Sequence, residues 1–397
     1  MIELTEEQRA VHDSVVDWYK SNPDRYISVG GLAGCGKTTV IGFIADTLKR
    51  EFGTLPIAYV CYTGKASLVL ARKLKNLDFN DSVGTIHSLI YKPIVDEDGS
   101  ILGWARKDDV DASLIIVDEA SMVDKDIWRD LTSYGIPILA VGDHGQLPPI
   151  GEGGFSLMRN PDLKLVTVHR QALENPIIKL SLYVRRHGSI PTRVFGKTAA
   201  KLDYSIDQRA KDILYGYDFR TDSQILCGMN KTRVKLNDLV RGTNGFDCDD
   251  PLPGEKLICL KNNRELGIMN GQMGVLNEAK FATELLFDLN ITMDGLSGPI
   301  NALTHRNAFG SVKYDVAMKE LYADALLAGL PYDKKPKINM FDFGYAISIH
   351  KAQGSEFQRV VLIEERNSFQ SDDDYTRWLY TGITRASEKL VIIDNFY

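Results

Sequence analysis

A glycine-rich segment near the N-terminus carries a lysine and a threonine at the spacing that phosphate-binding loops use. Residues 31–38, GLAGCGKT, fit the pattern G-x-x-x-x-G-K-T, with an apolar run (26–29) directly before and a helical pattern (39–50) directly after. In that context backbone N–H groups and a helix N-terminus surround phosphates, Lys37 reaches the β- and γ-phosphates, and Thr38 binds Mg2+. The residues expected to bind ATP here are Gly34, Cys35, Gly36, Lys37, Thr38 and Thr39.

Two carboxylates follow the apolar run 114–117. A buried strand that ends in two acids can place them beside a bound metal ion and a water molecule. Asp118 would hold Mg2+ together with Thr38, and Glu119 would polarise the attacking water. Two acids at a strand end are otherwise commonly solvated surface groups, but the glycine loop in the same chain favours catalysis.

A third segment, 142–149 (GDHGQLPP), follows another apolar run. Gln146 could sense the γ-phosphate or position the catalytic water. The segment could equally be a turn set by its glycines and two prolines. The local residues leave both interpretations open.

Strands and helices must alternate to bring these segments together. Thr5 and Gln8 fit a capping box ahead of a helical pattern, and strands are expected at 57–62, 114–117 and 136–141, with helices between them. The alternation resumes with a strand at 224–227, a helix at 231–239 and strands near 345, at 360–363 and at 390–393. The pattern predicts an α/β protein with two mostly parallel sheets.

In this order the three segments resemble superfamily 1 helicases, in which a GDxxQLPP element follows the strand-end acids. Residues 167–171 (TVHRQ) resemble the family's arginine-bearing motif IV, 345–356 (YAISIHKAQGSE) its motif V, and 379–386 (LYTGITRA) its motif VI. The resemblance covers both α/β halves and nearly the whole chain.

The resemblance implies two RecA-like parallel-sheet cores with two small insertions. The first core would span 1–163 and carry a β-hairpin at 91–109, where apolar pairs flank an acidic turn. The second core would combine 164–253 with 341–397. Between them, 254–340 is rich in glycine and short apolar runs and resembles an SH3-like β-barrel.

Family similarity also suggests roles around the nucleotide. Arg170 and Arg385 would approach from the second core and complete the site when the cleft closes, which would couple closure to hydrolysis. Taken alone, each arginine is more typical of a surface salt bridge. Glu356, beside Gly354, would contact the ribose, and Gln8 would read the adenine edge. The capping box explains Gln8 without any nucleotide.

A motor on nucleic acid must hold a single strand across both cores, through backbone phosphates and stacked bases. Residues 62–65 resemble motif Ia and 83–88 motif Ib, and three residues of the second half occupy comparable positions. Thr63 could simply cap its helix, and the two histidines could be structural. The resemblance favours binding for Thr63, Thr85 and Ser348 and leaves the histidines open. The expected contacts are Thr63, Lys65, Thr85, His87, Asn230, Ser348 and His350.

The hairpin at 91–109 lies where RecD-like and Dda-like helicases carry a strand-separating pin. Trp104, or Ile101 and Leu102, could be the wedge, although an apolar hairpin face could also pack on a neighbouring domain. Compact insertions of this kind are typical of the branch that moves 5'-to-3', so direction rests on analogy.

Composition limits the possible classes. The 397 residues are 44% hydrophobic, the net charge is -6, and the sequence pI is near 5.7, so the chain is not an indiscriminately basic nucleic-acid coat. Five cysteines without a CxxC pair predict reduced thiols rather than disulfides or a zinc site. No apolar run approaches the roughly 20 residues of a membrane span, and no import signal is evident. We expect a cytoplasmic protein of a bacterial or phage-infected cell, acting as a monomer.

Three functions compete at this point. The first is an ATP-dependent 5'-to-3' DNA helicase that acts on single-stranded and forked DNA and meets single-strand-binding or replication proteins. The second is a DNA-stimulated ATPase that remodels or displaces bound proteins without processive unwinding. The third, a small-molecule kinase, leaves Arg170, Arg385 and the second core without a purpose.

Overall fold

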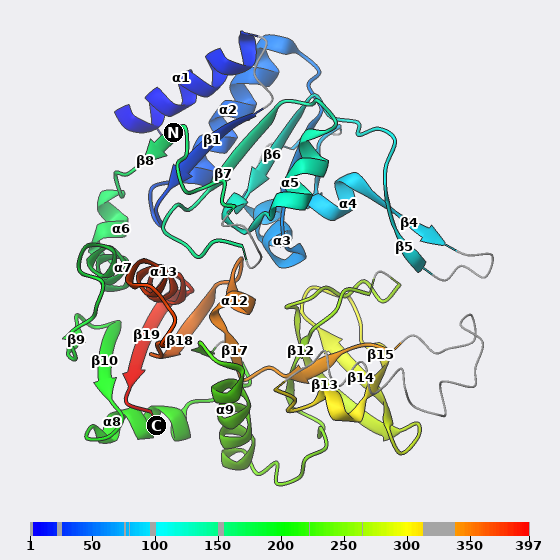
Figure 1. The fold of residues 1–397 in the computed structure, drawn as a ribbon, viewed down its shortest axis with the longest axis vertical. Helices are drawn as coiled ribbons and strands as arrows, with labels where there is room; N and C mark the ends of the chain where they lie inside the picture. Colours follow the sequence, from blue (N-terminus) through cyan, green and yellow to red (C-terminus); the bar gives the residue numbers. More distant parts are fainter. Residues whose placement is uncertain are drawn as a thin grey trace. The chain divides into compact units, whose positions relative to one another are not determined.

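The computed structural model describes residues 3–21, 26–74, 77–78, 80–95, 101–149, 155–221, 223–263, 265–312 and 338–396. At residues 95, 101–103, 170 and 171 only the backbone is described. The chain divides into two units, Met1–Arg185 and Arg186–Tyr397 (Figure 1). None of the helices in these ranges combines the length and the apolar character needed to span a membrane.

A six-stranded parallel sheet organises the first unit, in the order β3-β2-β6-β7-β1-β8. Because all six strands run the same way, their carboxyl ends meet at one edge, where the predicted phosphate loop and the paired acids lie. The strands are β1 (Tyr26–Gly31), β2 (Ile57–Cys61), β3 (Ser82–Thr85), β6 (Leu114–Asp118), β7 (Ile138–Gly142) and β8 (Leu163–Leu165).

Helices cover both faces of this sheet. Alternate strand residues point to opposite faces, so Tyr59 and Ile116 pack with α1 (Glu6–Lys20), α2 (Lys37–Phe52) and α3 (Gly64–Lys73). Val60 and Val117 pack on the other side with α4 (Ile86–Ile90) and α5 (Lys125–Thr132). A 3-10 turn, η1 (Ala120–Met122), joins β6 to α5.

A separate two-stranded antiparallel sheet follows α4. It pairs β4 (Tyr91–Val95) with β5 (Ile101–Arg106) over the segment expected to form a hairpin. The acidic turn at 96–100 lies outside the described residues.

The expected border between the two cores at residue 164 is wrong. Leu163–Leu165 forms β8, which pairs in parallel with β1, and the division falls after Arg185. The segment 163–175 therefore belongs to the phosphate-loop unit, together with α6 (Arg170–Glu174) and most of α7 (Pro176–His187). A strand of three residues is too short for its periodicity to distinguish it from a linker.

The second unit contains another six-stranded sheet, in the order β17-β11-β18-β19-β10-β9. Its strands are parallel except β9, an antiparallel edge strand. The strands are β9 (Val194–Phe195), β10 (Ala199–Asp203), β11 (Ser223–Cys227), β17 (Ala346–Ser348), β18 (Phe357–Ile363) and β19 (Ala386–Asp394). The helices are α8 (Gln208–Gly216), α9 (Asn230–Thr243), α12 (Ile349–Ala352) and α13 (Asp372–Ile383).

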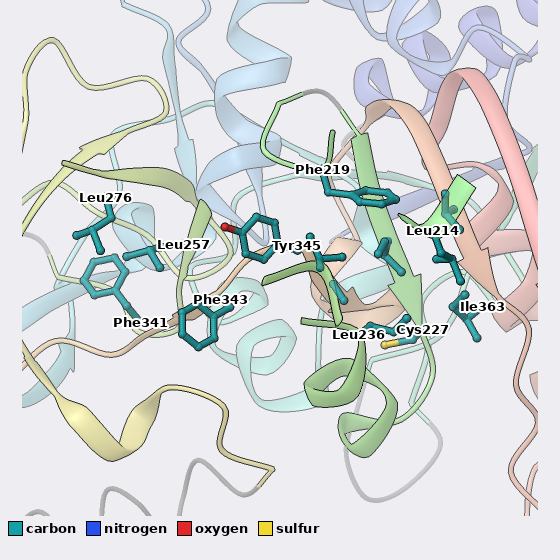
Figure 2. Close-up of a cluster of buried hydrophobic side chains, with 14 of the residues drawn as sticks. Leu214, Phe219, Cys227, Leu236, Leu257, Leu276, Phe341, Phe343, Tyr345 and Ile363 are labelled. Carbon is teal, nitrogen blue, oxygen red and sulfur yellow. The ribbon is translucent and has the colours of Figure 1, made fainter. Parts of the chain in front are cut away.

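A five-stranded antiparallel sheet is inserted between α9 and β17, in the order β15-β14-β13-β12-β16. Its hydrophobic residues are continuous with those of the parallel sheet, so that Leu257, Phe343 and Leu236 belong to one buried cluster (Figure 2). The strands are β12 (Lys256–Cys259), β13 (Met273–Phe281), β14 (Leu286–Met293), β15 (Ile300–His305) and β16 (Phe341–Phe343), and the 3-10 turn η2 (Arg306–Ala308) follows β15.

The expected border at residue 341 also needs correction. Phe341–Phe343 pairs with β12 and belongs to the inserted sheet rather than to the second core. The core resumes at Ala346, after Gly344 passes so close to the Leu257 carbonyl carbon that an added Cβ would lie 3.0 Å from it.

Candidate nucleotide site and nucleic-acid surface

The glycine loop leaves β1 and enters α2 in a conformation that depends on two glycines. Gly34 and Gly36 both have φ of 80°, in the left-handed region that side chains with a Cβ rarely adopt. A Cβ on Gly36 would also lie 2.5 Å from the Gln8 amide nitrogen and 2.7 Å from the His169 ring. The loop is therefore held tightly against α1 and the segment before α6.

The start of α2 can accept an anion. No side chain caps this helix, and its first turn contains no acidic residue. The Lys37 ammonium group donates to the Gly31 and Leu32 carbonyls, at 2.8 and 3.2 Å. Burial lowers the pKa of Lys37, but nearby negative charges, chiefly Asp143, outweigh it and raise the pKa overall. Lys37 therefore remains a full positive charge beside open helix N–H groups, which is the arrangement a phosphate group requires.

The two predicted carboxylates lie at the end of β6. Burial, and then the charge of Glu119, raise the pKa of Asp118 to about 6. Glu119 follows with φ 53° and ψ 39°, and its backbone N–H donates to the Asp118 carboxylate at 2.9 Å. Its Oε2 atom is buried and has no hydrogen-bond partner within the described part of the chain. Both carboxylates are thus poorly solvated, as expected of groups that meet a cation or a water when a ligand binds.

A cation at this point would need oxygen atoms from the ligand. Within the described ranges, no three His, Cys, Asp or Glu side chains gather closely enough to bind a metal alone. Mg2+ keeps several waters and binds through one or two protein oxygens plus phosphate groups. The buried Asp118 carboxylate at the end of β6 and the Thr38 hydroxyl at the start of α2 are oxygen donors of the kind that such an ion takes.

The segment after β7 forms a turn around Asp143. The buried Asp143 carboxylate accepts from the Gly145 N–H at 2.8 Å, and its carbonyl accepts from the Gln146 N–H at 3.2 Å. Gln146 is itself buried, at 5% exposure. The segment therefore is a turn, set by the hydrogen bonds of Asp143, and this turn also holds the Gln146 side chain inside the unit. The structure is compatible with both interpretations of the sequence.

Gln8 links the first helix to the glycine loop. Its backbone N–H and side chain complete the capping box with Thr5. Its amide nitrogen also donates to the Cys35 carbonyl at 3.0 Å and lies 2.8 Å from His169 Nε2. Gln8 is 2% exposed. The capping role is therefore present, and the rest of the amide contacts the phosphate loop.

Two neighbours of this glutamine were not anticipated from the sequence. The Glu7 carboxylate accepts from the Val166 and Thr167 N–H groups, both at 2.9 Å, and the His169 N–H donates to the Gly34 carbonyl at 3.2 Å. These contacts attach the segment before α6 to α1 and to the loop. The residues that make these contacts are more than 130 positions apart in the sequence, so no local sequence pattern predicts them.

Arg170 needs a correction. It was expected to reach the nucleotide from the second core, but its backbone opens α6 within the first unit, next to His169. The reason is β8, which returns the chain to the first sheet. The Arg170 side chain lies outside the described residues.

The expected nucleic-acid contacts of the first unit occupy the same sheet edge. In register, Cys61 of β2 stands beside Asp118 on one side and Thr85 on the other. Thr63 caps α3 and Thr85 caps α4, with hydroxyl oxygens accepting at 3.3 and 3.1 Å. Both threonines therefore mark helix N-termini at this edge, with Lys65 one residue inside α3.

His87 lies in α4 between two tyrosines. Its ring centre is 6.5 Å from that of Tyr62 and 5.3 Å from that of Tyr91. His87 is exposed, whereas both tyrosines are partly buried. Three rings thus extend from the end of β2 to the start of β4.

Trp104 stands opposite Pro93 in the hairpin, two residues from the pair Tyr91 and Arg106. Opposed residues share a face in an antiparallel pair and the side-chain period is two, so Trp104 shares its face with Tyr91. It is 45% exposed. The side chains of Ile101 and Leu102, the alternative wedge residues, lie outside the described residues.

In the second unit, Arg385 is held by backbone oxygens. Its guanidinium donates to the Thr381 and Ser355 carbonyls, both at 3.1 Å, and to the Thr384 hydroxyl at 3.2 Å. The side chain is 5% exposed. Gly354 precedes this contact with φ 71°, and Glu356 is exposed. Motifs V and VI are thus joined through one arginine.

Ser348 repeats the capping pattern of the first unit, because its hydroxyl accepts from the Lys351 N–H at 3.3 Å at the start of α12. Burial lowers the pKa values of His350 and Lys351. The Lys351 ammonium donates to Asn270 of the inserted sheet at 2.8 Å. Asn230 opens α9 and is exposed.

Two family models match the chain. One, described as an AAA domain, covers residues 3–200, and the other, a UvrD-like helicase C-terminal domain, covers residues 343–393. Together they include the phosphate loop, the paired acids and both later motifs.

Curated relatives include proteins named as helicases. The ATP-dependent RecD2 DNA helicase of Deinococcus radiodurans is 26% identical over 97% of this chain and 48% of its own length. The ATP-dependent DNA helicase dda of Enterobacteria phage T4 is 26% identical over 71% of this chain and 69% of its own. The chain spans 36% of an uncharacterised protein of Methanocaldococcus jannaschii, at 26% identity. The chain thus spans about half the length, or less, of two of these relatives.

One similar solved structure is Pif1 helicase from Bacteroides in complex with ADP-AlF3 and single-stranded DNA. It aligns over 100% of this chain and 93% of its own chain, with a TM-score of 0.55 and 18% sequence identity. Pif1 helicase from Candida albicans aligns over 100% of this chain and 96% of its own, with a TM-score of 0.51 and 16% identity. At these identities the likeness concerns the fold, which is an α/β arrangement with RecA-like parallel sheets.

Proposed function

Because the chain belongs to the RecD- and Dda-like helicases of superfamily 1, we propose that it hydrolyses Mg-ATP to move 5'-to-3' along single-stranded DNA and to part duplex strands. The observation that carries this proposal is the shared edge of the first sheet. The phosphate loop, the Asp118 and Glu119 pair, and the capped helix starts at Thr63 and Thr85 all follow the carboxyl ends of adjacent or nearby strands. A conformational change at the bound nucleotide could therefore be transmitted to the DNA-binding residues through the ends of a few neighbouring strands.

The hydrolysis step would use charges that the first unit keeps poorly solvated. Lys37 and the first amides of α2 would bind the β- and γ-phosphates, and Thr38 with Asp118 would hold Mg2+, which supplies charge neutralisation for phosphoryl transfer. Glu119 would accept a proton from the attacking water, and Gln146 would orient that water. Glu356 would contact the ribose, Gly354 of the same motif would lie at the nucleotide, and Gln8 would contact the adenine.

Two arginines would complete the transition-state contacts. Arg170 follows His169, which already contacts the phosphate loop through Gln8. Arg385 would come from the second unit. Arginine donors of this kind stabilise the charge that spreads over the transferred phosphoryl group.

Single-stranded DNA would bind along the N-termini of several helices and along exposed aromatic side chains. Thr63, Thr85 and Ser348 each mark a helix start where backbone amides favour a phosphate. Lys65, Asn230 and His350 would add contacts, and His87 would stack on a base. At the hairpin, Trp104 would meet the duplex.

Direction rests on the compact insertions. The inserted five-stranded sheet would act as the SH3-like barrel of the RecD-like branch, and the hairpin as its pin. The partners proposed are single-stranded DNA and forks, with single-strand-binding or replication proteins beside them, in the cytoplasm.

A fork assay tests this function. Forks with only a 5' tail or only a 3' tail are incubated with the wild-type protein and with Glu119→Gln, which retains side-chain volume but not the proton acceptor. We expect opening of the 5'-tailed fork alone, single-strand-stimulated ATP turnover, and neither activity in Glu119→Gln. Opening from the 3' tail alone would refute the direction, and stimulated turnover without opening of either fork would refute the helicase.

A further inference from the structure

Among the described residues of the unit, the hairpin β4–β5 pairs with no other strand and forms a sheet of its own. A two-stranded hairpin is marginally stable in water without further packing. Its direction must therefore be set where its two strands leave the unit, between Ile90 and Lys107.

One tyrosine joins both ends of the hairpin. The Tyr134 hydroxyl, two residues beyond α5, lies 2.9 Å from the Ile90 carbonyl and 2.8 Å from the Lys107 carbonyl, so its single hydrogen is shared between them. Ile90 directly precedes β4 and Lys107 directly follows β5. The Lys107 N–H also donates to the Ile90 carbonyl at 2.8 Å. The base of the hairpin is closed around this hydroxyl.

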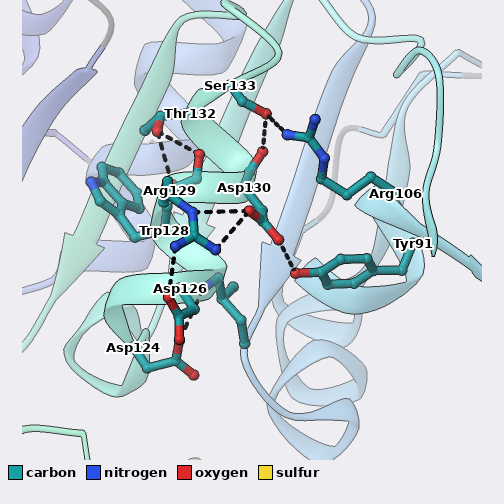
Figure 3. A network of polar contacts seen from close by, with 10 residues as sticks. Tyr91, Arg106, Asp124, Asp126, Trp128, Arg129, Asp130, Thr132 and Ser133 are labelled. Carbon is teal, nitrogen blue, oxygen red and sulfur yellow. Dashed lines mark hydrogen bonds and ion pairs between the residues drawn. The ribbon is translucent and has the colours of Figure 1, made fainter. Parts of the chain in front are cut away.

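The first cross-strand pair makes a second attachment (Figure 3). Tyr91 and Arg106 are opposed in register, and both reach toward α5. The Tyr91 hydroxyl donates to Asp130 Oδ2 at 2.7 Å, and the Arg106 guanidinium donates to the Ser133 hydroxyl. Each strand thus has its own polar contact with the same helix end.

The acceptor on α5 is itself fixed. The Arg129 guanidinium contacts Asp130 Oδ1 at 3.3 Å and Asp126 at 2.9 Å, so Oδ2 of Asp130 is left toward Tyr91 (Figure 3). Below this network, Ile127, Trp128 and Leu131 bury α5 against the sheet. The contact with Asp130 therefore rests on a packed helix, and Ser133 and Tyr134 lie in the turn directly after it.

This helix is also the element that follows the catalytic carboxylates. α5 begins at Lys125, capped by Asp124 at 2.9 Å, and only η1 separates it from Glu119. A displacement at the end of β6 would reach the hairpin base through one short turn and one helix.

We propose that Tyr91, Arg106 and Tyr134 are positioning residues that fix the direction of the hairpin on α5, so that the hairpin stays rigid while it parts a duplex. This inference rests on the proposed helicase function. A wedge that yields at its base would bend when base pairs resist it, and the motor would then advance on its strand without opening the fork. Loss of the contacts should uncouple opening from ATP turnover.

The test removes hydroxyl groups and keeps the rings. Tyr91→Phe, Tyr134→Phe and the double variant are compared with wild type and with Tyr19→Phe. Tyr19 is a matched control, because its hydroxyl also donates to a backbone carbonyl, that of Ser113 at 3.3 Å, but on α1. Three quantities are measured: ATP turnover on single-stranded DNA, base pairs opened per ATP on a 5'-tailed fork, and amide exchange across residues 101–110.

We expect the double variant to open about fivefold fewer base pairs per ATP, in line with the loss of a hydrogen bond or two. ATP turnover on single-stranded DNA should remain within about twofold of wild type, and exchange across 101–110 should be faster, while Tyr19→Phe matches wild type in all three.

Unchanged opening per ATP in the double variant would overturn the inference, and so would a parallel fall in turnover, which indicates a general structural role. Wild-type unwinding separates these results from failure of the proposed function. If the wild-type protein opens no fork, the proposed function fails and the wedge fails with it, and faster exchange then marks the contacts as supports of the fold only.

Discussion

Buried charged side chains have different partners in two regions of the molecule. One region is the phosphate-loop edge of the first unit, and the other is the junction of the inserted sheet in the second unit. At the loop edge, the hydrogen bonds of Lys37 to described residues go to carbonyls of its own loop, and Glu119 Oε2 is buried with no hydrogen-bond partner among those residues. At the junction, Arg241 makes two contacts with Glu255 and lies 3.9 Å from the Phe343 ring centre. Further buried contacts of this kind are Arg233 with Asp342, and Lys256 with the Phe219, Thr221 and Ser223 carbonyls.

The difference lies in what the charges are for. Arg241 and Arg233 come from α9, and Glu255 and Asp342 belong to the inserted segment, so these pairs bind the insertion to the core. The loop edge must instead receive a highly charged ligand, and groups that were fully paired would have to be separated first. One region therefore uses charge for stability, and the other keeps charge available for a ligand.

The largest effect is expected at Lys37. Lys37→Ala should lower ATP turnover about a thousandfold, since it removes the cation nearest the phosphates. The urea midpoint of unfolding should stay close to wild type, because the ammonium group contacts only loop carbonyls. Turnover is measured in steady state with saturating single-stranded DNA. Retained turnover, or a large loss of stability, would remove the contrast between the two regions.

Glu255→Gln should show the reverse pattern. It leaves Arg241 buried without its counter-charge, and we expect a loss of about 3 kcal/mol in the free energy of unfolding. ATP turnover per folded molecule should be unaffected. Urea titration measures the loss, and Lys280→Ala is the control, because its contact with Glu278 is exposed and should contribute less than about 0.5 kcal/mol. Similar losses in both variants would show that burial of the pair does not matter.

The smallest effect is a gain of stability at Asp118. Burial and Glu119 raise the folded pKa of Asp118 to about 6, from 3.8. Because the folded state binds this proton more tightly, ionisation costs stability as pH rises from about 4 through 6. Asp118→Asn should therefore stabilise the nucleotide-free protein by about 2 to 3 kcal/mol at pH 8 and by almost nothing at pH 4.

Thermal unfolding at both pH values measures this difference. Added Mg-ATP should reverse the order at pH 8, because only the wild-type carboxylate would gain a cation. A variant less stable than wild type at both pH values would show that Asp118 is paired within the fold after all.

The nucleotide site was accessible from the sequence because its signals are local. Residues 31–38 and the acids at 118 and 119 lie within a few positions of the strands that present them, so the pattern placed each at the end of a strand, while their shared edge came from the structure. The α/β class followed in the same way from alternating apolar runs. The predicted roles of the nucleotide and DNA contacts remain predictions.

The errors arose where distant segments or short strands decide the structure. β8 has three residues and depends on pairing with β1, so the unit border and the placement of Arg170 were wrong. Residues 341–348 form one mostly apolar stretch that serves two sheets, which displaced the second border. The contacts of Glu7 and His169 join residues that are far apart in the sequence, and hydrophobic periodicity carries no information about such contacts.

The backbone of Glu119 has a consequence for which residues this position can accept. At φ 53°, glycine, asparagine or aspartate would fit more easily, and a glutamate there is disfavoured by about 1 kcal/mol. Glycine would relax the chain but remove the carboxylate, and a shorter acid would relax it while withdrawing the oxygen atoms from the strand end. Position 119 thus has the longer acidic side chain although its backbone conformation disfavours glutamate. The conformational free energy of the backbone and the length of side chain needed at the strand end therefore oppose each other at this one residue.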